Sequence, residues 1–285
     1  MPFPPTVKRG TYIPRRGGQE QMSFETVIYE KSGRIVKITM NRPNVLNALN
    51  RVAIGELTMT LEQAARDDEV RVVILTGMGR GFSTGHDLKE GIAGPEDGRK
   101  LHVEIWELMY TIWEMGKPVI AQINGHCLGI ACDLALACDL SVAADVATFG
   151  EPEIRASSGS EFPLLPWVVG MKRAKELILT GDTIDAKEAE RIGMVNKVVP
   201  LDRLEEEVGK LARKLANVPA FALRMNKTTI NRAFEMMGMR NAMAQSLESI
   251  SLLIVTDTEE RKKFREIRAE KGLKAALEWR DSLFK

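Results

Sequence analysis

Residues 117–154 read KPVIAQINGHCLGIACDLALACDLSVAADVATFGEPEI, and the order of apolar segments in this stretch decides the fold. An apolar strand over 119–123 leads through an Asn-Gly turn into an apolar helix over 128–137 and a second strand over 138–144. Continuous apolar strands are typical of sheets that helices cover on both faces. The stretch therefore predicts strand–helix–strand units and a mostly parallel sheet.

The same alternation of strands and helices continues before this stretch. We expect two strands within 24–40, a helix over 50–66, a buried strand over 70–77 and a helix over 99–115. After residue 163 helical patterns dominate, interrupted by one strand-like piece, MVNKVV. The expected helices cover residues 171–180, 185–192, 201–216, 219–237, 239–255 and 257–281.

The chain divides into three expected parts. The N-terminus is basic and rich in proline and glycine, which is typical of a flexible tail over residues 1–22, and it lacks the apolar core of a secretory signal. Residues 23–200 are predicted to form the α/β core. Residues 201–285 are predicted to form a helical C-terminal domain.

The overall composition argues against some kinds of binding partner. A net charge of +1, from 40 basic and 39 acidic residues, argues against nucleic acid or an anionic membrane surface as the main partner. No apolar run approaches the ~18 residues that a membrane span needs. The spacing of Cys127, Cys132 and Cys138 fits neither a zinc site nor a disulfide framework. Free buried thiols in a reducing cytoplasm are expected.

Glycine and polar residues follow the buried strands, where α/β folds place ligands. Gly85 and Gly129 let the backbone approach a bound group, and N–H groups at a helix start carry partial positive charge. Two such groups from different loops can bind one developing oxyanion. Asp133 and Glu153 could then move protons. From the residues alone, two other interpretations stay open, namely a structural role for Asp133 in its apolar helix and a solvated loop position for Glu153.

Four segments together resemble the enoyl-CoA hydratase/isomerase (crotonase) superfamily over roughly residues 24–280. They are the stretch at 117–154, NRPNVLNALN at 41–50, GFSTGHDLKE at 81–90 and AKELILTGDTIDAKEAERIGMVNKVVP at 174–200. The resemblance implies a crotonase-like spiral of ββα units, with a helical C-terminal domain that serves oligomerisation and covers the pocket. It also implies an acyl-CoA substrate, a homotrimer or a homohexamer built as a dimer of trimers, and no metal or cofactor beyond the coenzyme A moiety.

The resemblance also assigns roles to individual residues. The backbone N–H groups of His86 and Ile130 would form an oxyanion hole, and Asp133 and Glu153 would be the two catalytic carboxylates. The residues expected along the coenzyme A moiety are Ala48, Gly85, His86, Asp87, Leu88, Lys89 and Gly129. A lone histidine beside glycines first suggests an imidazole base, but the resemblance assigns the role at position 86 to the amide.

Three positions depart from the pattern of the hydratases. Ile130 replaces the usual glycine, which keeps the N–H but adds a side chain. Asp133 is one methylene shorter than the usual glutamate and resembles the dienoyl-CoA isomerases, which carry a further acid at the position of Glu161. The segment ASSGSEFPLLPW around Glu161 lacks the family's PGxGGTQRLPR run. Glu161 is therefore either a third catalytic acid or an acid at the pocket rim.

The main hypothesis is an enoyl-CoA hydratase, which adds water to a 2-enoyl-CoA in syn fashion. The alternatives on the same scaffold are isomerisation of an enoyl- or dienoyl-CoA and another thioester reaction, such as hydrolysis, decarboxylation or retro-aldol cleavage. A CoA-binding scaffold without catalysis is the alternative from a different class. Acids at both expected catalytic positions favour an enzyme.

Overall fold

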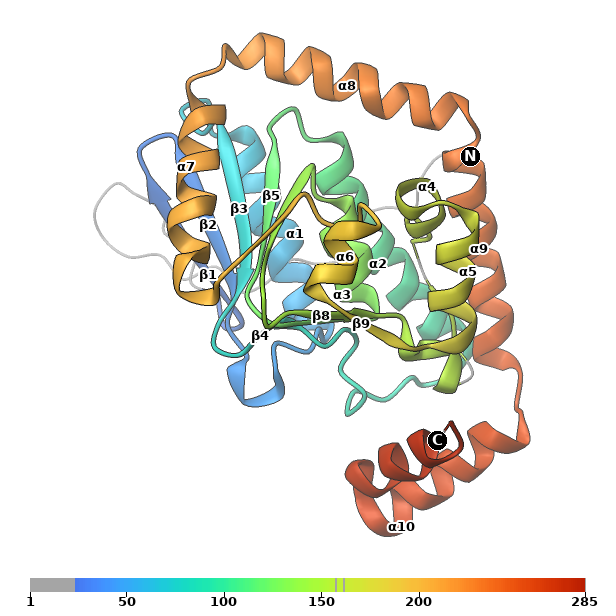
Figure 1. Cartoon of the computed structure of the whole chain (residues 1–285). Coiled ribbons are helices and arrows are strands. Elements are labelled where there is room, and N and C mark those ends of the chain that lie inside the picture. The colour runs from blue at the N-terminus through green and yellow to red at the C-terminus, as the bar shows by residue number, and fades with distance from the viewer. Residues whose placement is uncertain (1–23, 157, 161, 285) are drawn as a thin grey trace, which may run out of the picture.

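The computed structural model describes residues 24–156, 158–160 and 162–284, apart from the side chains of Ile254 and Val255 (Figure 1). The predicted flexible tail over residues 1–22 and the candidate acid Glu161 lie outside these residues. Within the described ranges no helix is long and apolar enough to cross a membrane.

The larger of two sheets has the strand order β1-β2-β3-β5-β7-β10. Its strands are β1 (Val27–Ser32), β2 (Ile35–Met40), β3 (Val72–Gly77), β5 (Val119–Ile123), β7 (Leu140–Ala144) and β10 (Lys197–Val199). β1 and β2 form an antiparallel hairpin, and every other neighbouring pair is parallel. The mostly parallel sheet predicted from the sequence is confirmed.

The smaller sheet has the strand order β4-β6-β8-β9 and consists of three-residue strands. They are β4 (Gly81–Ser83), β6 (His126–Leu128), β8 (Thr148–Gly150) and β9 (Thr183–Asp185), of which only β9 runs antiparallel to its neighbour. The sequence analysis placed no strand at any of these positions. Strands this short carry too little alternation to be recognised by pattern.

Each repeating ββα unit contributes one strand to the larger sheet and one strand to the smaller sheet before its helix begins. β3 continues into β4, β5 into β6, and β7 into β8. The corners are tight, because a Cβ on Gly77 would lie 2.2 Å from the Gly81 carbonyl oxygen, and one on Gly125 2.0 Å from the Arg80 carbonyl oxygen. Only glycine fits such approaches. This connection generates the predicted spiral of ββα units.

Helices cover both faces of the larger sheet (Figure 1). On one face lie α1 (Arg51–Arg66), α2 (Pro95–Glu114) and α3 (Ile130–Ala137), and on the other lies α7 (Leu204–Ala216). Alternate side chains of β3 point to opposite faces of the sheet. Val73 and Leu75 belong to the main core, whereas Val72 and Ile74 pack towards α7. This two-sided burial explains why β3 reads as a continuous apolar run.

The start of α2 differs from the sequence expectation. The helix begins at Pro95 rather than at residue 99, after a run of glycine and proline that reads as a loop. Proline is well suited to the first helical position because its missing N–H has no helical acceptor there, and Glu96 and Asp97 favour the positive end of the helix dipole.

The remaining helices surround the core and extend from it. Short helices α4 (Leu165–Val169), α5 (Met171–Thr180) and α6 (Ala186–Arg191) follow the last repeat, and α8 (Ala220–Met236), α9 (Met239–Val255) and α10 (Glu259–Ser282) form the C-terminal region. The 3₁₀ turns are η1 (Pro43–Val45), η2 (Pro152–Ala156) and η3 (Leu201–Arg203). α9 packs on α2, and α10 packs on η2. Residue 200 as a domain boundary stays a prediction.

Candidate active site

The loop that carries His86 is paired with the loop that carries Ala48. The Leu49 N–H donates to the Gly85 carbonyl at 2.7 Å, and the Asp87 N–H donates to the Leu49 carbonyl at 2.9 Å. These two bonds form a parallel bridge between Leu49 and His86. Because residues 85 and 87 use the side facing Leu49, the N–H of the intervening His86 points to the opposite side.

The opposite side of this loop is the start of α3. A Cβ on Gly85 would lie 2.6 Å from the Leu128 carbonyl oxygen and 3.3 Å from the Ile130 nitrogen. Ile130 is the first residue of α3, so its N–H has no acceptor within the helix and lies at the positive end of the helix dipole. The structure therefore brings the two loops that carry the predicted amide donors into direct contact.

An ion pair braces the His86 loop against the Ala48 loop. Arg42 Nη2 lies 2.9 Å from Asp87 Oδ2, and the same guanidinium donates to the Ala48 carbonyl. Burial alone would raise the pKa of Asp87, but the Lys89 N–H and the Arg42 guanidinium together hold it below its ordinary value. Asp87 is thus a structural anion that fixes the loop. The sequence analysis did not single out Arg42.

Asp133 is fully buried in the first turns of α3. Ser160 Oγ lies 3.2 Å from each carboxylate oxygen, and the Phe162 N–H donates to Oδ2 at 3.0 Å. These donors offset the cost of burying a carboxylate in an otherwise apolar helix. Asp133 stands three residues after Ile130, so the two share one face of the helix.

Glu153 lies at the start of η2, directly over Gly129. A Cβ on Gly129 would lie 1.7 Å from Glu153 Oε1, and Gly129 has a φ of 60°. The Gly129 N–H donates to the Gly150 carbonyl at 2.9 Å, which ties the loop before α3 to β8. Glu153 and the Ile130 amide are therefore separated by a single glycine without a side chain.

The other predicted coenzyme A contacts surround these loops. Ala48 and Gly85 are buried, whereas Leu88 and Lys89 are exposed beyond the His86 loop. The three cysteines are unpaired and buried, as expected. Burial raises the pKa of Cys132, which lies inside α3 beside Cys127.

Two features near the carboxylates were not foreseen. The first is an aromatic cluster in which the ring centroid of Phe162 lies 6.1 Å from that of Trp106 and 5.7 Å from that of Tyr110. The second is the partner of Asp133, Ser160, which is 27 residues away in sequence. Helical spacing would have suggested a Trp106–Tyr110 contact, but no sequence signal links either feature to Asp133.

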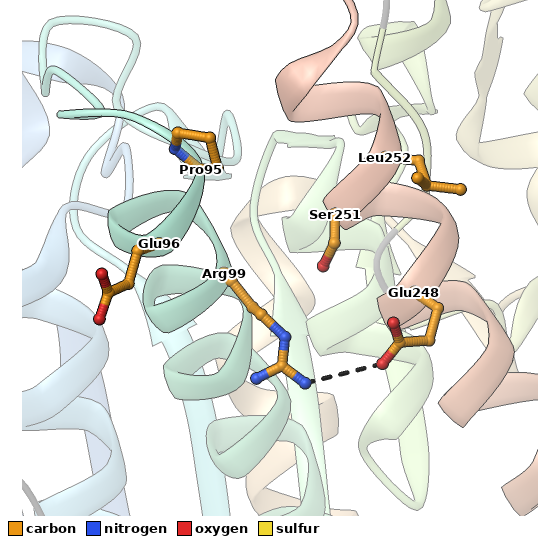
Figure 2. Close-up of a pocket in the computed structure, with 6 residues that line it drawn as sticks. All are labelled: Pro95, Glu96, Arg99, Glu248, Ser251 and Leu252. Atoms are coloured by element: carbon orange, nitrogen blue, oxygen red, sulfur yellow. Dashed lines mark ion pairs between the residues drawn. The ribbon is translucent and has the colours of Figure 1, made fainter.

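An open groove lies between the first turns of α2 and the last turns of α9 (Figure 2). Arg99 on α2 and Glu248 on α9 form an ion pair across it at 3.6 Å. The residues that line it are Pro95, Glu96, Arg99, Glu248, Ser251 and Leu252. None of them is a predicted site residue, so the groove is separate from the paired loops.

Comparison with known proteins supports the resemblance stated above. The Enoyl-CoA hydratase/isomerase family matches residues 30–285. A probable enoyl-CoA hydratase of Mycobacterium tuberculosis is 38% identical over 75% of this chain and 84% of its own length. The short-chain-enoyl-CoA hydratase of Clostridium acetobutylicum is 36% identical with the same coverage.

Solved structures agree with this assignment. The crystal structure of an enoyl-CoA hydratase/isomerase from Xanthobacter autotrophicus Py2 superposes with a TM-score of 0.90 at 38% identity, covering 92% of this chain and all of the other. A probable enoyl-CoA hydratase from Mycobacterium thermoresistibile has a TM-score of 0.76 at 34% identity, over 80% of this chain and 95% of the other. The match over residues 30–285, together with the identity and the shared fold of these relatives, leads to one conclusion: the chain belongs to the enoyl-CoA hydratase/isomerase family.

Proposed function

We propose that this protein is an enoyl-CoA hydratase, which adds water in syn fashion across the double bond of a 2-enoyl-CoA thioester. One observation carries the proposal: the His86 and Ile130 loops touch, with Glu153 over Gly129 and Asp133 on the Ile130 face of α3. The named activity of the relatives at 36–38% identity, enoyl-CoA hydratase, favours hydration over the other reactions of this scaffold.

In the proposed reaction the thioester carbonyl oxygen accepts hydrogen bonds from the His86 and Ile130 N–H groups. Attack of water at C3 moves electron density onto this oxygen, and the two donors stabilise the resulting enolate-like state. Removing one donor of this kind typically lowers kcat by ~10²- to 10³-fold. Because the donors belong to the backbone, they are held in place before substrate arrives.

Asp133 and Glu153 carry the proposed proton transfers. Water loses one proton to a carboxylate as its oxygen bonds to C3, and C2 receives one proton from the carboxylate pair. The net change is one water added, with no oxidation or reduction. We therefore propose that no metal or cofactor is needed beyond the coenzyme A moiety. Glu161 remains a candidate third acid on the strength of its sequence position alone.

The coenzyme A moiety is proposed to lie along the His86 loop. Gly85 holds this loop against the start of α3, and the exposed Lys89 offers a cation to the phosphates. Arg42 and Asp87 would keep this surface rigid. Ala48, His86, Leu88 and Gly129 complete the proposed contact set.

We infer a homotrimer or a dimer of trimers in a reducing cytoplasm. Support for association comes from large apolar side chains exposed on the C-terminal helices, including Phe221 at 65% and Met236 at 83%. Unpaired Cys127, Cys132 and Cys138 fit a reducing compartment.

The test is turnover of crotonyl-CoA and of a 3,5-dienoyl-CoA by the full chain. We expect crotonyl-CoA to lose its enoyl absorbance and to gain the mass of one water. A shift of the dienoyl-CoA to a 2,4-diene without a mass change would instead indicate an isomerase. Release of free coenzyme A would indicate a hydrolase, and no turnover of any thioester would indicate a binding scaffold.

The same assay tests the carboxylates. Asp133→Asn and Glu153→Gln should each strongly lower kcat for hydration while coenzyme A binding stays nearly intact. Each amide keeps the shape of the carboxylate but cannot exchange the proton. Full activity in either variant would remove that residue from the mechanism.

A further inference from the structure

The hydroxyl of Ser160 joins a proposed catalytic carboxylate to a helix of the C-terminal region. Ser160 Oγ lies 3.2 Å from Asp133 Oδ1 and 3.2 Å from Asp133 Oδ2. On its other side, the Ser160 carbonyl accepts a hydrogen bond of 2.9 Å from Ser246 Oγ on α9. Ser160 therefore links α9 to Asp133 through one hydrogen bond at its carbonyl and another at its hydroxyl.

The backbone on either side of Ser160 is fixed by packing. A Cβ on Gly159 would lie 3.6 Å from Ile250 Cδ1 and from Leu253 Cδ1, so Gly159 rests directly on α9. On the other side, Phe162 is fully buried and donates its N–H to Asp133 at 3.0 Å. Ser160 is thus supported from both sides, and its hydroxyl is not a surface group that happens to reach Asp133.

We propose that Ser160 is a positioning residue for Asp133, and that Ser246 holds Ser160 in place. The proposal rests on the proposed function, in which Asp133 exchanges a proton with the substrate. A hydroxyl 3.2 Å from both oxygens restrains rotation of the carboxylate plane, and it adds to the bond that the Phe162 N–H makes to Oδ2. A donor to the carboxylate also favours its ionised form, ready to accept a proton. Ser160 touches no reacting atom in this scheme.

The direct test is kcat and KM of Ser160→Ala with crotonyl-CoA. Hydrogen bonds to charged groups contribute enough to predict a fall in kcat of about 10- to 100-fold, with KM changed little. Ser160→Thr retains the hydroxyl and should recover most of the rate.

Two further variants test the connection to α9. Ser246→Ala should lower kcat by about 3- to 10-fold, since a neutral hydrogen bond is weaker and acts through Ser160. Ser249→Ala is the matched control, because Ser249 lies on the same helix and its hydroxyl bonds only to the Gln245 carbonyl of its own helix. Thermal unfolding of each variant checks that the fold is retained.

A double-mutant comparison separates this proposal from the proposed function. In an Asp133→Asn background, Ser160→Ala should cause no further loss in kcat, because the carboxylate through which it acts is gone. If Asp133→Asn itself keeps full activity, the proposed mechanism fails. If Asp133→Asn is inactive while Ser160→Ala retains wild-type kcat, only the role of Ser160 fails. An Ala variant that loses rate without recovery in Ser160→Thr would also overturn it.

Discussion

At the scale of single residues, the site depends on backbone atoms as much as on side chains. The His86 N–H points away from Leu49 because the bonds at residues 85 and 87 use the other side of the chain. The Ile130 N–H has no acceptor within α3 because Ile130 is the first residue of that helix. Because both donors belong to the backbone, they remain after any substitution except proline. A substitution of His86 can therefore distinguish a role of the amide from a role of the imidazole.

The first prediction contrasts a side chain with an amide. His86→Ala keeps the N–H and should retain kcat within about tenfold, whereas Ile130→Pro removes an N–H and should lower kcat by ~10²- to 10³-fold. Proline is tolerated at the first position of a helix, so α3 should still form. Steady-state hydration of crotonyl-CoA measures both.

Ile130→Ala is the control for that pair, because it loses the buried side chain but keeps the N–H. It should remain far more active than Ile130→Pro. If His86→Ala abolishes turnover while the fold and coenzyme A binding persist, the imidazole takes part in the chemistry.

The second prediction concerns Gly129. In Gly129→Ala the new methyl would occupy the place of the Glu153 carboxylate, and a φ of 60° also strains an alanine. Displacing a reacting group by about 1 Å costs roughly 100-fold in rate, so kcat should fall by at least that factor. Gly55→Ala on α1, where the added Cβ meets nothing within 4 Å, should instead leave kcat unchanged and slightly stabilise the helix. Equal activity of the two variants would contradict the placement of Glu153.

At the scale of elements, the site is built where short strands and loops of different repeats meet. β4, β6 and β8 place the His86 loop, the start of α3 and η2 side by side. The Arg42–Asp87 pair then joins the loop after β2 to the loop after β4. The loop that carries the His86 N–H is therefore held in place by its contacts with the loop that carries Ala48. One of these contacts, the ion pair with Arg42, requires that Asp87 be charged.

The third prediction follows from that charge. The pKa of Asp87 is lower in the folded state than in the unfolded chain, so its contribution to stability is present above about pH 4 and is lost as pH falls through the folded value. Asp87→Asn should therefore destabilise the protein at pH 7, and the difference from wild type should shrink on acidification towards pH 3. Urea unfolding at several pH values measures this. A difference that is independent of pH would show that Asp87 is not held as an anion.

At the scale of the whole molecule, the C-terminal helices are tied to the core at a few polar points. α8 crosses from α7 to α9 along one end of the core (Figure 1). Lys227 Nζ anchors it, with contacts to Asp139 Oδ2 at 2.8 Å and to the Ile112 and Lys117 carbonyls at 2.8 Å and 3.2 Å. Asp139 is also fixed by the Val119 N–H at 2.7 Å, which places the anchor at the N-terminal end of β5.

The fourth prediction is that Lys227→Met lowers the free energy of unfolding by about 3 kcal/mol at pH 7, because it leaves the partly buried carboxylate of Asp139 without its cation. Burial raises the pKa of Asp139 against the opposing effect of Lys227. A raised pKa means that stability is lost as pH rises through it, so the cost of Lys227→Met should be smaller in acid. Chemical unfolding at pH 5 and pH 8 measures both effects.

Lys263→Met provides the matched control, since Lys263 pairs with Glu266 on an exposed surface of α10. Its effect should stay within about 0.5 kcal/mol. Adding Asp139→Asn to Lys227→Met should restore part of the lost stability, and a purely additive double variant would argue against a coupled pair.

How far the sequence predicts each feature depends on how local its cause is. The long strands and most helices were predictable, because their apolar residues repeat within a few positions. The strands of the smaller sheet were not, because three residues carry no period and their pairing is set by neighbours far along the chain. Asp133 was recognised as needing a partner, but its donor Ser160 is brought to it only by the path of the chain after η2.

The sequence by itself determined the class of fold, the family and the candidate residues, since each follows from local patterns or from motifs read in order. Only the tertiary structure decided which of those residues meet: the Gly85 contact with the start of α3, the Glu153 carboxylate over Gly129, and the enclosure of Asp133 by Ser160 and Phe162. The physical reason is that packing and hydrogen bonding between segments distant in sequence depend on three-dimensional distance, which no local pattern of residues records.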